Sequence, residues 1–216
     1  MIKSASKTAL VVGATGLVGN LLTRLLAESS AYERVKVLVR RPLGWQHPRV
    51  QEVQFDFDQP NGLLVQADDV FCCLGTTLKQ AGSKEAFRKV DYHYPLDVAR
   101  LGRTNGARQF FLVSAMGANV RSRFFYNRVK GETEGAIFSV GYPTFVVVRP
   151  SLLLGDRKET RLGEKVGEAF MRLFSPLIPA RYKAIEARSV ANALATLAQQ
   201  GLAGTHIVES DKLRTY

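Results

Sequence analysis

The sequence of 216 residues lacks several features that would place it in a specialised class of protein. It contains no run of eighteen apolar residues, so no membrane-spanning helix is expected. Its two cysteines, Cys72 and Cys73, are adjacent and cannot form an ordinary structural disulfide. The first residues also lack the apolar core of a signal peptide. Together these absences predict a protein of the reducing cytoplasm.

Histidine is scarce, and charge of one sign is in excess. His47, His93 and His206 show no spacing typical of a metal site, so we expect no bound metal. The net charge is +11, from 30 basic and 19 acidic residues. The basic residues are scattered rather than gathered into runs. They therefore indicate a solvated surface that partly serves an anionic cofactor, rather than a nucleic-acid-binding protein.

Apolar runs and helical patterns alternate along the whole chain, without an internal repeat or a low-complexity linker. This alternation predicts one α/β domain over residues 1–216, with a doubly wound parallel sheet and helices on both faces. The expected strands are 7–12, 35–39, 50–55, 70–74, 109–114, 144–148 and 205–208. The expected helices are 16–28, 83–103, 124–138 and 190–199, the last one capped by Ser189.

The first expected strand ends in a glycine-rich turn, residues 13–19, which leads into a helix. In such a turn the first glycine reverses the chain, the second lets backbone approach a diphosphate, and the third lets helix and strand pack closely. The helix then offers free N–H groups to the phosphates. A Rossmann-like dinucleotide site is expected here, rather than an ordinary loop. Its expected residues are Gly13, Thr15, Gly16, Leu17, Val18 and Gly19.

The end of the second strand indicates which dinucleotide binds. An acidic residue there would contact the ribose 2′-hydroxyl of NAD, whereas arginine suits the 2′-phosphate of NADP. Arg40 and Arg41 occupy this place, so NADP(H) is expected in preference to NAD(H); a solvated charge pair is the alternative. Further cofactor contacts are expected from residues near the ends of other strands, namely Asp56, Phe57, Leu74, Gly75, Thr76 and Arg149.

A candidate catalytic set follows the fifth strand. Ser114 ends that strand, and Tyr126 and Lys130 lie four residues apart on the next expected helix, hence on one face. A phenol has a pKa near ~10, and a neighbouring ammonium stabilises its phenolate form, which suits proton exchange at neutral pH. The serine hydroxyl would hold a substrate oxygen. These groups suit hydride transfer between a nicotinamide and a carbonyl–alcohol pair.

These motifs resemble those of the short-chain dehydrogenase/reductases in their atypical branch, and most of all the Tat-interactive-protein-like oxidoreductases. The resemblance rests on the glycine spacing, on residues 71–77 (FCCLGTT), on the Tyr126-x-x-x-Lys130 motif and on residues 149–157. It implies a Rossmann fold, NADP(H) binding, and Ser114, Tyr126 and Lys130 as the catalytic set, with Lys130 also at the nicotinamide ribose. Many dehydrogenases of the superfamily add an asparagine before strand five, whereas this chain has Asp91 in that neighbourhood.

The function expected from these features is an NADP(H)-dependent oxidoreductase acting on a small carbonyl or alcohol substrate. A non-enzymatic NADP(H)-binding protein that reports redox state is the alternative. Residues 155–185 are expected to form a small substrate-side lid or a contact in a homodimer, with core packing as the alternative. Arg121, Arg123 and Arg128 flank Tyr126 and would either be solvated or attract an anionic substrate.

Overall fold

Seven parallel strands form the centre of the molecule. The computed structural model describes residues 7–155 and 179–216. Its main sheet has the order β3-β2-β1-β4-β5-β6-β9, which confirms the predicted doubly wound α/β fold. The strands are β1 (Lys7–Val12), β2 (Tyr32–Val39), β3 (Val50–Gln54), β4 (Asp69–Cys72), β5 (Gln109–Val113), β6 (Thr144–Arg149) and β9 (Gly204–Glu209).

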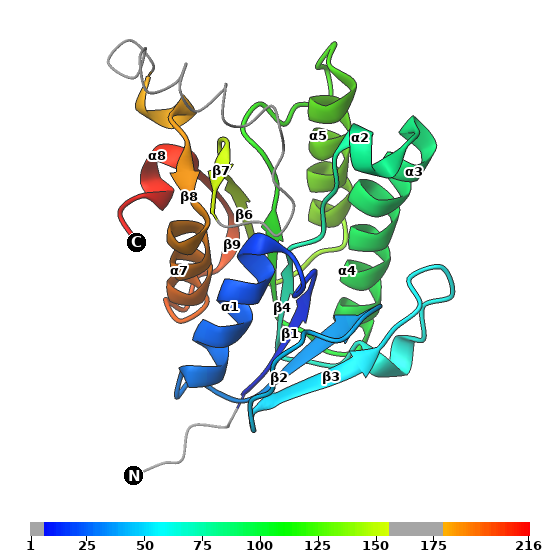
Figure 1. Ribbon diagram of the computed structural model, residues 1–216, viewed down its shortest axis with the longest axis vertical. Helices are drawn as coiled ribbons and strands as arrows, with labels where there is room; N and C mark the ends of the chain where they lie inside the picture. Colours follow the sequence, from blue (N-terminus) through cyan, green and yellow to red (C-terminus); the bar gives the residue numbers. More distant parts are fainter. Residues whose placement is uncertain (1–6, 156–178) are drawn as a thin grey trace.

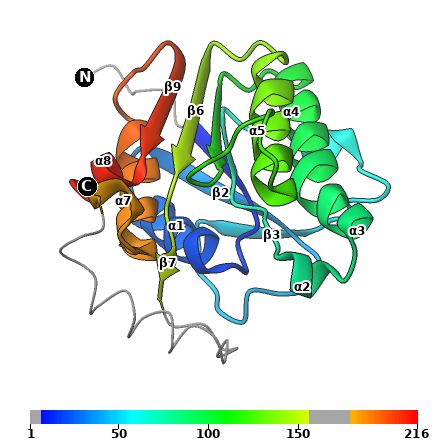
Figure 2. The same ribbon diagram turned by 90° about the horizontal axis from the view of Figure 1, so that it is seen from above.

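Helices cover both faces of the sheet (Figures 1 and 2). On one face α1 (Leu17–Glu28) packs beside α7 (Ala187–Leu197). On the other face α4 (Tyr94–Thr104) packs beside α5 (Phe125–Phe138). The remaining helical segments within residues 7–155 and 179–216 are short: η1 (Gly62–Leu64), α2 (Leu78–Ala81), α3 (Lys84–Arg88), η2 (Lys89–His93), η4 (Ala180–Tyr182) and α8 (Ser210–Leu213).

Two apolar layers, one on each side of the sheet, form the core. Because successive strand residues point to opposite faces, Val11 belongs to the layer under α1 and α7, while Val12 belongs to the layer under α4 and α5. Cys72 and Cys73 lie in different layers for the same reason, because they are adjacent in the sequence. Burial raises the pKa of the Cys72 thiol to about 12.

The long helix expected over 83–103 is interrupted, and proline explains the interruption. It consists of α3, a π-helical turn η2, and α4. Pro95 has no N–H and cannot bond the carbonyl of Asp91 four residues earlier, so the regular ladder fails at this point. The hydroxyl of Thr133 on α5 lies 2.8 Å from that carbonyl and takes the place of the missing donor.

The predicted start of the last long helix is wrong. Helix α7 begins at Ala187 with Glu186 as its N-cap, so Ser189 lies inside the helix. The chain enters α7 directly from a two-residue strand, β8 (Ile185–Glu186), and Ala187 is buried, so packing fixes the start earlier than side-chain capping suggested. Strand β8 pairs with β7 (Leu153–Leu154) in a small parallel sheet.

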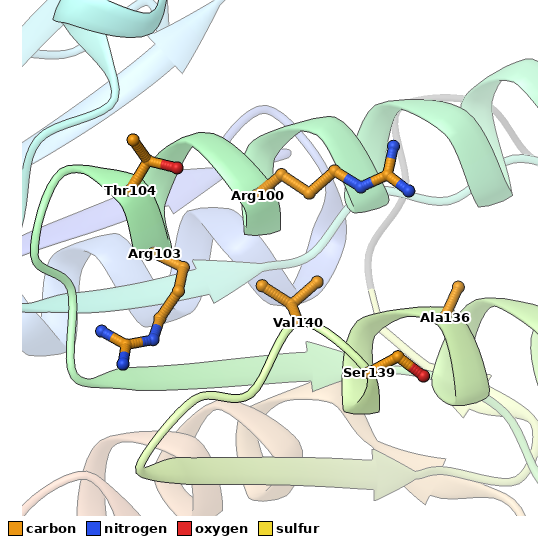
Figure 3. A pocket seen from close by; sticks show the side chains of 6 residues that line it. All are labelled: Arg100, Arg103, Thr104, Ala136, Ser139 and Val140. Carbon is orange, nitrogen blue, oxygen red and sulfur yellow. The ribbon is translucent and has the colours of Figure 1, made fainter.

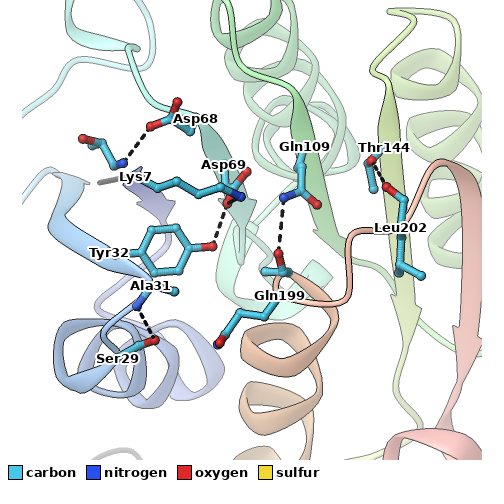
Figure 4. Close-up of polar contacts among 12 residues, drawn as sticks. Lys7, Ser29, Ala31, Tyr32, Asp68, Asp69, Gln109, Thr144, Gln199 and Leu202 are labelled. Atoms are coloured by element: carbon cyan, nitrogen blue, oxygen red, sulfur yellow. Dashed lines mark hydrogen bonds and ion pairs between the residues drawn. The ribbon is translucent and has the colours of Figure 1, made fainter. Parts of the chain in front are cut away.

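Polar contacts join neighbouring segments at the amino ends of the strands (Figure 4). The Tyr32 hydroxyl donates to Asp69 at 2.7 Å, and Lys7 reaches the same carboxylate oxygen at 3.2 Å. Thr144 donates to the carbonyl of Leu202 at 2.5 Å. At the edge opposite the glycine turn, the Asp69 contacts join β1, β2 and β4, and the Thr144 contact joins β6 to the segment that precedes β9.

The predicted lid or dimer segment, 155–185, falls mostly on residues 156–178, which lie outside the described residues. Its role stays a prediction, as does the single domain over 1–216. Among the described helices, none has the length and apolar character needed to cross a membrane.

Candidate functional site

The glycine turn after β1 has the close backbone contacts expected of a dinucleotide loop. Gly13 has φ +81°, and a Cβ on it would lie 2.5 Å from the carbonyl oxygen of Cys73. A Cβ on Gly19 would lie 2.2 Å from the carbonyl oxygen of Gly13. Side chains at either position would therefore separate β1, the loop after β4 and helix α1. The turn is as tight as the sequence predicted.

Helix α1 presents an open N-terminus beside this turn. Gly16 is the N-cap and provides no side chain to bond the first N–H groups, and the first turn contains no acidic residue. The N–H groups of Leu17, Val18 and Gly19 therefore lie at the positive end of the helix dipole without an intrahelical partner. Such an end, with Thr15 exposed next to it, fits a diphosphate group.

The tips of β2 and β3 lie at the same edge of the sheet. Arg40 and Arg41 follow β2 directly, and both are exposed. Asp56 follows β3 and accepts the backbone N–H of Asp58 at 2.8 Å. The Phe57 ring is buried against Tyr94, with ring centroids 5.2 Å apart, so only its backbone remains for a cofactor. The two arginines are therefore exposed at the same edge of the sheet as the glycine turn.

Asp91 connects the loop after β4 to helix α5. That loop contains Leu74, Gly75 and Thr76, and the Thr76 N–H donates to Asp91 Oδ2 at 2.9 Å. The other carboxylate oxygen lies 2.7 Å from Lys130 Nζ, an ion-pair contact without the alignment of a hydrogen bond. Both side chains are buried, at 0% and 7% exposure. The site therefore contains a buried ion pair that includes one predicted catalytic residue.

Lys130 and Tyr126 lie on one face of α5, as predicted from their spacing. Burial opposes the charge on Lys130, but the charges of Asp91 and Tyr126 and the contact with Asp91 together raise the pKa of Lys130. The Tyr126 ring packs on Phe87 of α3 with centroids 5.6 Å apart. Its hydroxyl makes no hydrogen bond within the described parts of the chain.

Ser114 follows β5, and its hydroxyl donates to Glu134 of α5. Arg149, at the end of β6, donates to both oxygens of the same carboxylate: Nε to Oε1 at 3.1 Å and Nη2 to Oε2 at 2.5 Å. The hydrogen bonds to Glu134 raise the pKa of Arg149, although burial acts in the opposite direction. Ser114 makes no hydrogen bond to Tyr126 or Lys130. The roles predicted for Ser114 and Arg149 toward substrate and cofactor stay predictions.

The fold thus gathers the glycine turn, the tips of β2, β3 and β4, and helix α5 at the carboxyl edge of the sheet. Sequence reasoning missed Glu134, although its position four residues after Lys130 placed it on the same stripe of the helix. It noted Asp91 only as a departure from the pattern of the superfamily. The proline four residues later could have indicated that Asp91 lies in a distorted turn.

Hollows elsewhere on the molecule do not belong to this site. A cavity of about 290 Å³ lies between the C-terminal ends of α4 and α5 and is lined by Arg100, Arg103, Thr104, Ala136, Ser139 and Val140 (Figure 3). Because these helices run antiparallel to the strands, their C-terminal ends are at the edge opposite the glycine turn. Within residues 7–155 and 179–216, no three His, Cys, Asp or Glu side chains gather as a metal site.

Comparison with solved structures shows the fold. MoeE5 in complex with UDP-glucose and NAD superposes with a TM-score of 0.72 at 14% identity, over 95% of this chain and 79% of that one. A short-chain dehydrogenase family protein from Francisella tularensis gives 0.69 at 12% identity, over 98% of this chain and 100% of that one. No family model matches the chain.

Comparison with curated proteins shows the family. The mitochondrial protein FMP52 of Candida albicans is 31% identical over 203 residues, which cover 90% of this chain and 89% of that protein. Protein HTATIP2 of Rattus norvegicus is 34% identical over 174 residues, 78% of this chain and 72% of that protein. The FMP52 relatives are named as mitochondrial, which contradicts the cytoplasmic location predicted from the sequence. Adjacent cysteines and a non-apolar start therefore did not indicate the compartment correctly. The chain belongs to the family of FMP52 and HTATIP2.

Proposed function

We propose that this protein is an NADP(H)-dependent oxidoreductase that interconverts a carbonyl and an alcohol. The observation that carries the proposal is Tyr126 beside the charged, buried Lys130, at the same sheet edge as the glycine turn. A phenol next to an ammonium is a suitable proton donor and acceptor for a reacting oxygen. The structure of MoeE5, which has the same fold and contains bound NAD, supports a nicotinamide dinucleotide as the cofactor.

The residues of the site divide the work of this reaction. The open N-terminus of α1 would hold the cofactor diphosphate, and Arg40 and Arg41 would hold the 2′-phosphate. A bound nicotinamide would supply or accept the hydride. Tyr126 would give a proton to the substrate oxygen or take one from it. Lys130 would stabilise the phenolate form of Tyr126, and Lys130 would also contact the nicotinamide ribose.

Replacing Tyr126 by phenylalanine tests the proposal. The variant keeps the ring that packs on Phe87 but loses the hydroxyl that exchanges the proton. With NADPH and a panel of aldehydes, ketones and quinones, we expect turnover to fall about 100-fold or more, with NADPH binding retained. Tyr92→Phe is the matched control, because Tyr92 packs under Arg88 on the adjacent π-helical turn. Equal turnover by wild type and Tyr126→Phe would refute the catalytic role.

A further inference from the structure

Pro95 fixes the backbone of Asp91 against helix α5. The carbonyl of Asp91 cannot accept the usual helical hydrogen bond from the residue four positions later, because that residue is a proline. The Thr133 hydroxyl lies 2.8 Å from this carbonyl and 2.8 Å from that of Val129, so its one hydrogen is shared between them. The π-helical turn is thereby attached to the helix that contains Tyr126 and Lys130.

The side chain of Asp91 makes two further attachments within the site. Its Oδ2 accepts the Thr76 N–H, and its Oδ1 lies 2.7 Å from Lys130 Nζ. The backbone of Gly75 lies directly against this pair, because a Cβ there would be 3.6 Å from Oδ1 and 3.7 Å from Nζ. One buried carboxylate thus connects the cofactor-side loop after β4 with the lysine of α5.

The groups around Lys130 indicate that it needs the Asp91 carboxylate to stay charged. Among the described residues, three groups act on the ammonium: Asp91 from the π-helical turn, Tyr126 from its own helix and Cys72 from β4. Asp91 is the one carboxylate among them. A buried ammonium without a counter-charge loses its hydration and tends to become neutral. The charge state of Lys130 therefore depends on Asp91.

We propose that Asp91 is a positioning residue of the reaction site: its carboxylate keeps Lys130 charged and fixes the Gly75–Thr76 loop beside it. This inference rests on the proposed function for its catalytic consequence. The effect on Lys130 itself is independent of any cofactor or substrate, so the two can be tested separately.

The variant Asp91→Asn removes the charge and keeps the volume and an oxygen that can accept from Thr76. Lysine ¹³C-labelled full-length protein, free of cofactor, would be titrated by NMR, with Lys130 assigned from its absence in Lys130→Met. In wild type we expect Lys130 to stay charged beyond the usual lysine range, because the pKa of Lys130 is raised. In Asp91→Asn we expect it to titrate about three pH units lower. Asp97→Asn, on the adjoining α4, should leave the titration unchanged.

Turnover provides a second measurement that a purely structural role would not produce. We expect Asp91→Asn to stay within about threefold of wild type at pH 6, where Lys130 is charged in both proteins. At pH 9 we expect a loss of about tenfold or more, because Lys130 is then neutral in the variant. An unchanged Lys130 titration, or an equal shift in Asp97→Asn, would overturn the inference. The expected titration without turnover on any carbonyl would contradict only the proposed function.

A double variant tests whether the charges of Asp91 and Lys130 are coupled, even if Asp91→Asn does not fold. Asp91→Asn leaves Lys130 buried without its partner, whereas Asp91→Asn combined with Lys130→Met removes both charges. We expect the double variant to fold even where Asp91→Asn does not and, where both fold, to unfold at a higher urea concentration than Asp91→Asn. A double variant that is no more stable than Asp91→Asn would show that the two charges are not coupled, contrary to the inference.

Discussion

Ser114 and Glu134 are joined by a buried hydrogen bond in which the serine hydroxyl donates to the carboxylate. Because Arg149 donates to the same carboxylate, the Glu134 side chain attaches the ends of β5 and β6 to helix α5. A hydroxyl that donates to a carboxylate can still accept a hydrogen bond from a substrate alcohol. To donate to a carbonyl oxygen, Ser114 would have to rotate away from Glu134.

We expect Glu134→Gln to lower the free energy of unfolding by about 1–3 kcal/mol, because partly buried Arg149 loses its nearest counter-charge and keeps only Glu209, 3.9 Å away. Urea unfolding followed by circular dichroism measures this. Glu186→Gln is the control, since Glu186 is exposed and makes no capping hydrogen bond, and it should stay within about 0.5 kcal/mol of wild type. Equal effects of the two variants would argue against a structural role for the Glu134 pair.

Two glycine-to-alanine substitutions, one in the glycine turn and one on α5, should have opposite effects on stability. Gly19→Ala would place a Cβ 2.2 Å from the Gly13 carbonyl oxygen, so α1 must move, at a cost of about 1–3 kcal/mol. Gly135→Ala on α5 meets nothing within 4 Å and should stabilise the protein by about 0.5–1 kcal/mol. Thermal and urea unfolding of both variants would check the signs, and a Gly19→Ala protein as stable as wild type would contradict the close packing.

Arg40 and Arg41 predict the choice of cofactor. Replacing both by alanine should weaken NADPH binding about 10- to 150-fold, the loss of a charge-assisted bond worth about 1.5–3 kcal/mol. NADH binding should change little, because NADH lacks the 2′-phosphate. Arg34→Ala, near the other end of β2, is the matched control. Calorimetric titration measures all three; tighter binding of NADH than NADPH by wild type would contradict the assignment.

Tyr32 predicts a stability effect at the amino edge of the sheet. Tyr32→Phe removes the donor to the buried carboxylate of Asp69 and should cost about 1–3 kcal/mol at pH 7. Tyr182→Phe, at a half-exposed side chain, should have little effect. If the two variants unfold at the same urea concentration, the Tyr32 contact contributes nothing measurable.

The same tyrosine predicts a dependence on alkaline pH. Burial, and then the charge of Asp69 and the hydrogen bond to it, raise the pKa of Tyr32 above its ordinary value near ~10. The unfolded chain therefore loses this proton first, so the contribution of Tyr32 is present below about pH 10 and declines above it, by about 1.4 kcal/mol per pH unit. The stability difference between wild type and Tyr32→Phe should shrink above pH 10. A constant difference from pH 8 to 11 would contradict this assignment.

Local features of the sequence were sufficient for the fold and for the two motifs that flank the site. The turn of residues 13–19 depends on the absence of side chains at Gly13 and Gly19, a property of the residues themselves. The placement of Tyr126 and Lys130 on one face follows from helix geometry alone. Alternating apolar residues likewise indicated the strands, because their period reflects the two faces of a buried sheet.

Contacts between distant segments decided the rest. Asp91 and Lys130 are thirty-nine positions apart in the printed numbering, and only packing of the π-helical turn on α5 brings them to 2.7 Å. The sequence predicted that the Ser114 hydroxyl contacts a substrate, but in the tertiary structure this hydroxyl is bonded to Glu134. The sequence by itself determined which chemical groups the site can use and on which elements they lie. The tertiary structure decided which of these groups are paired. A charge or hydroxyl needs a partner only when it is buried, and it is buried only in the folded chain.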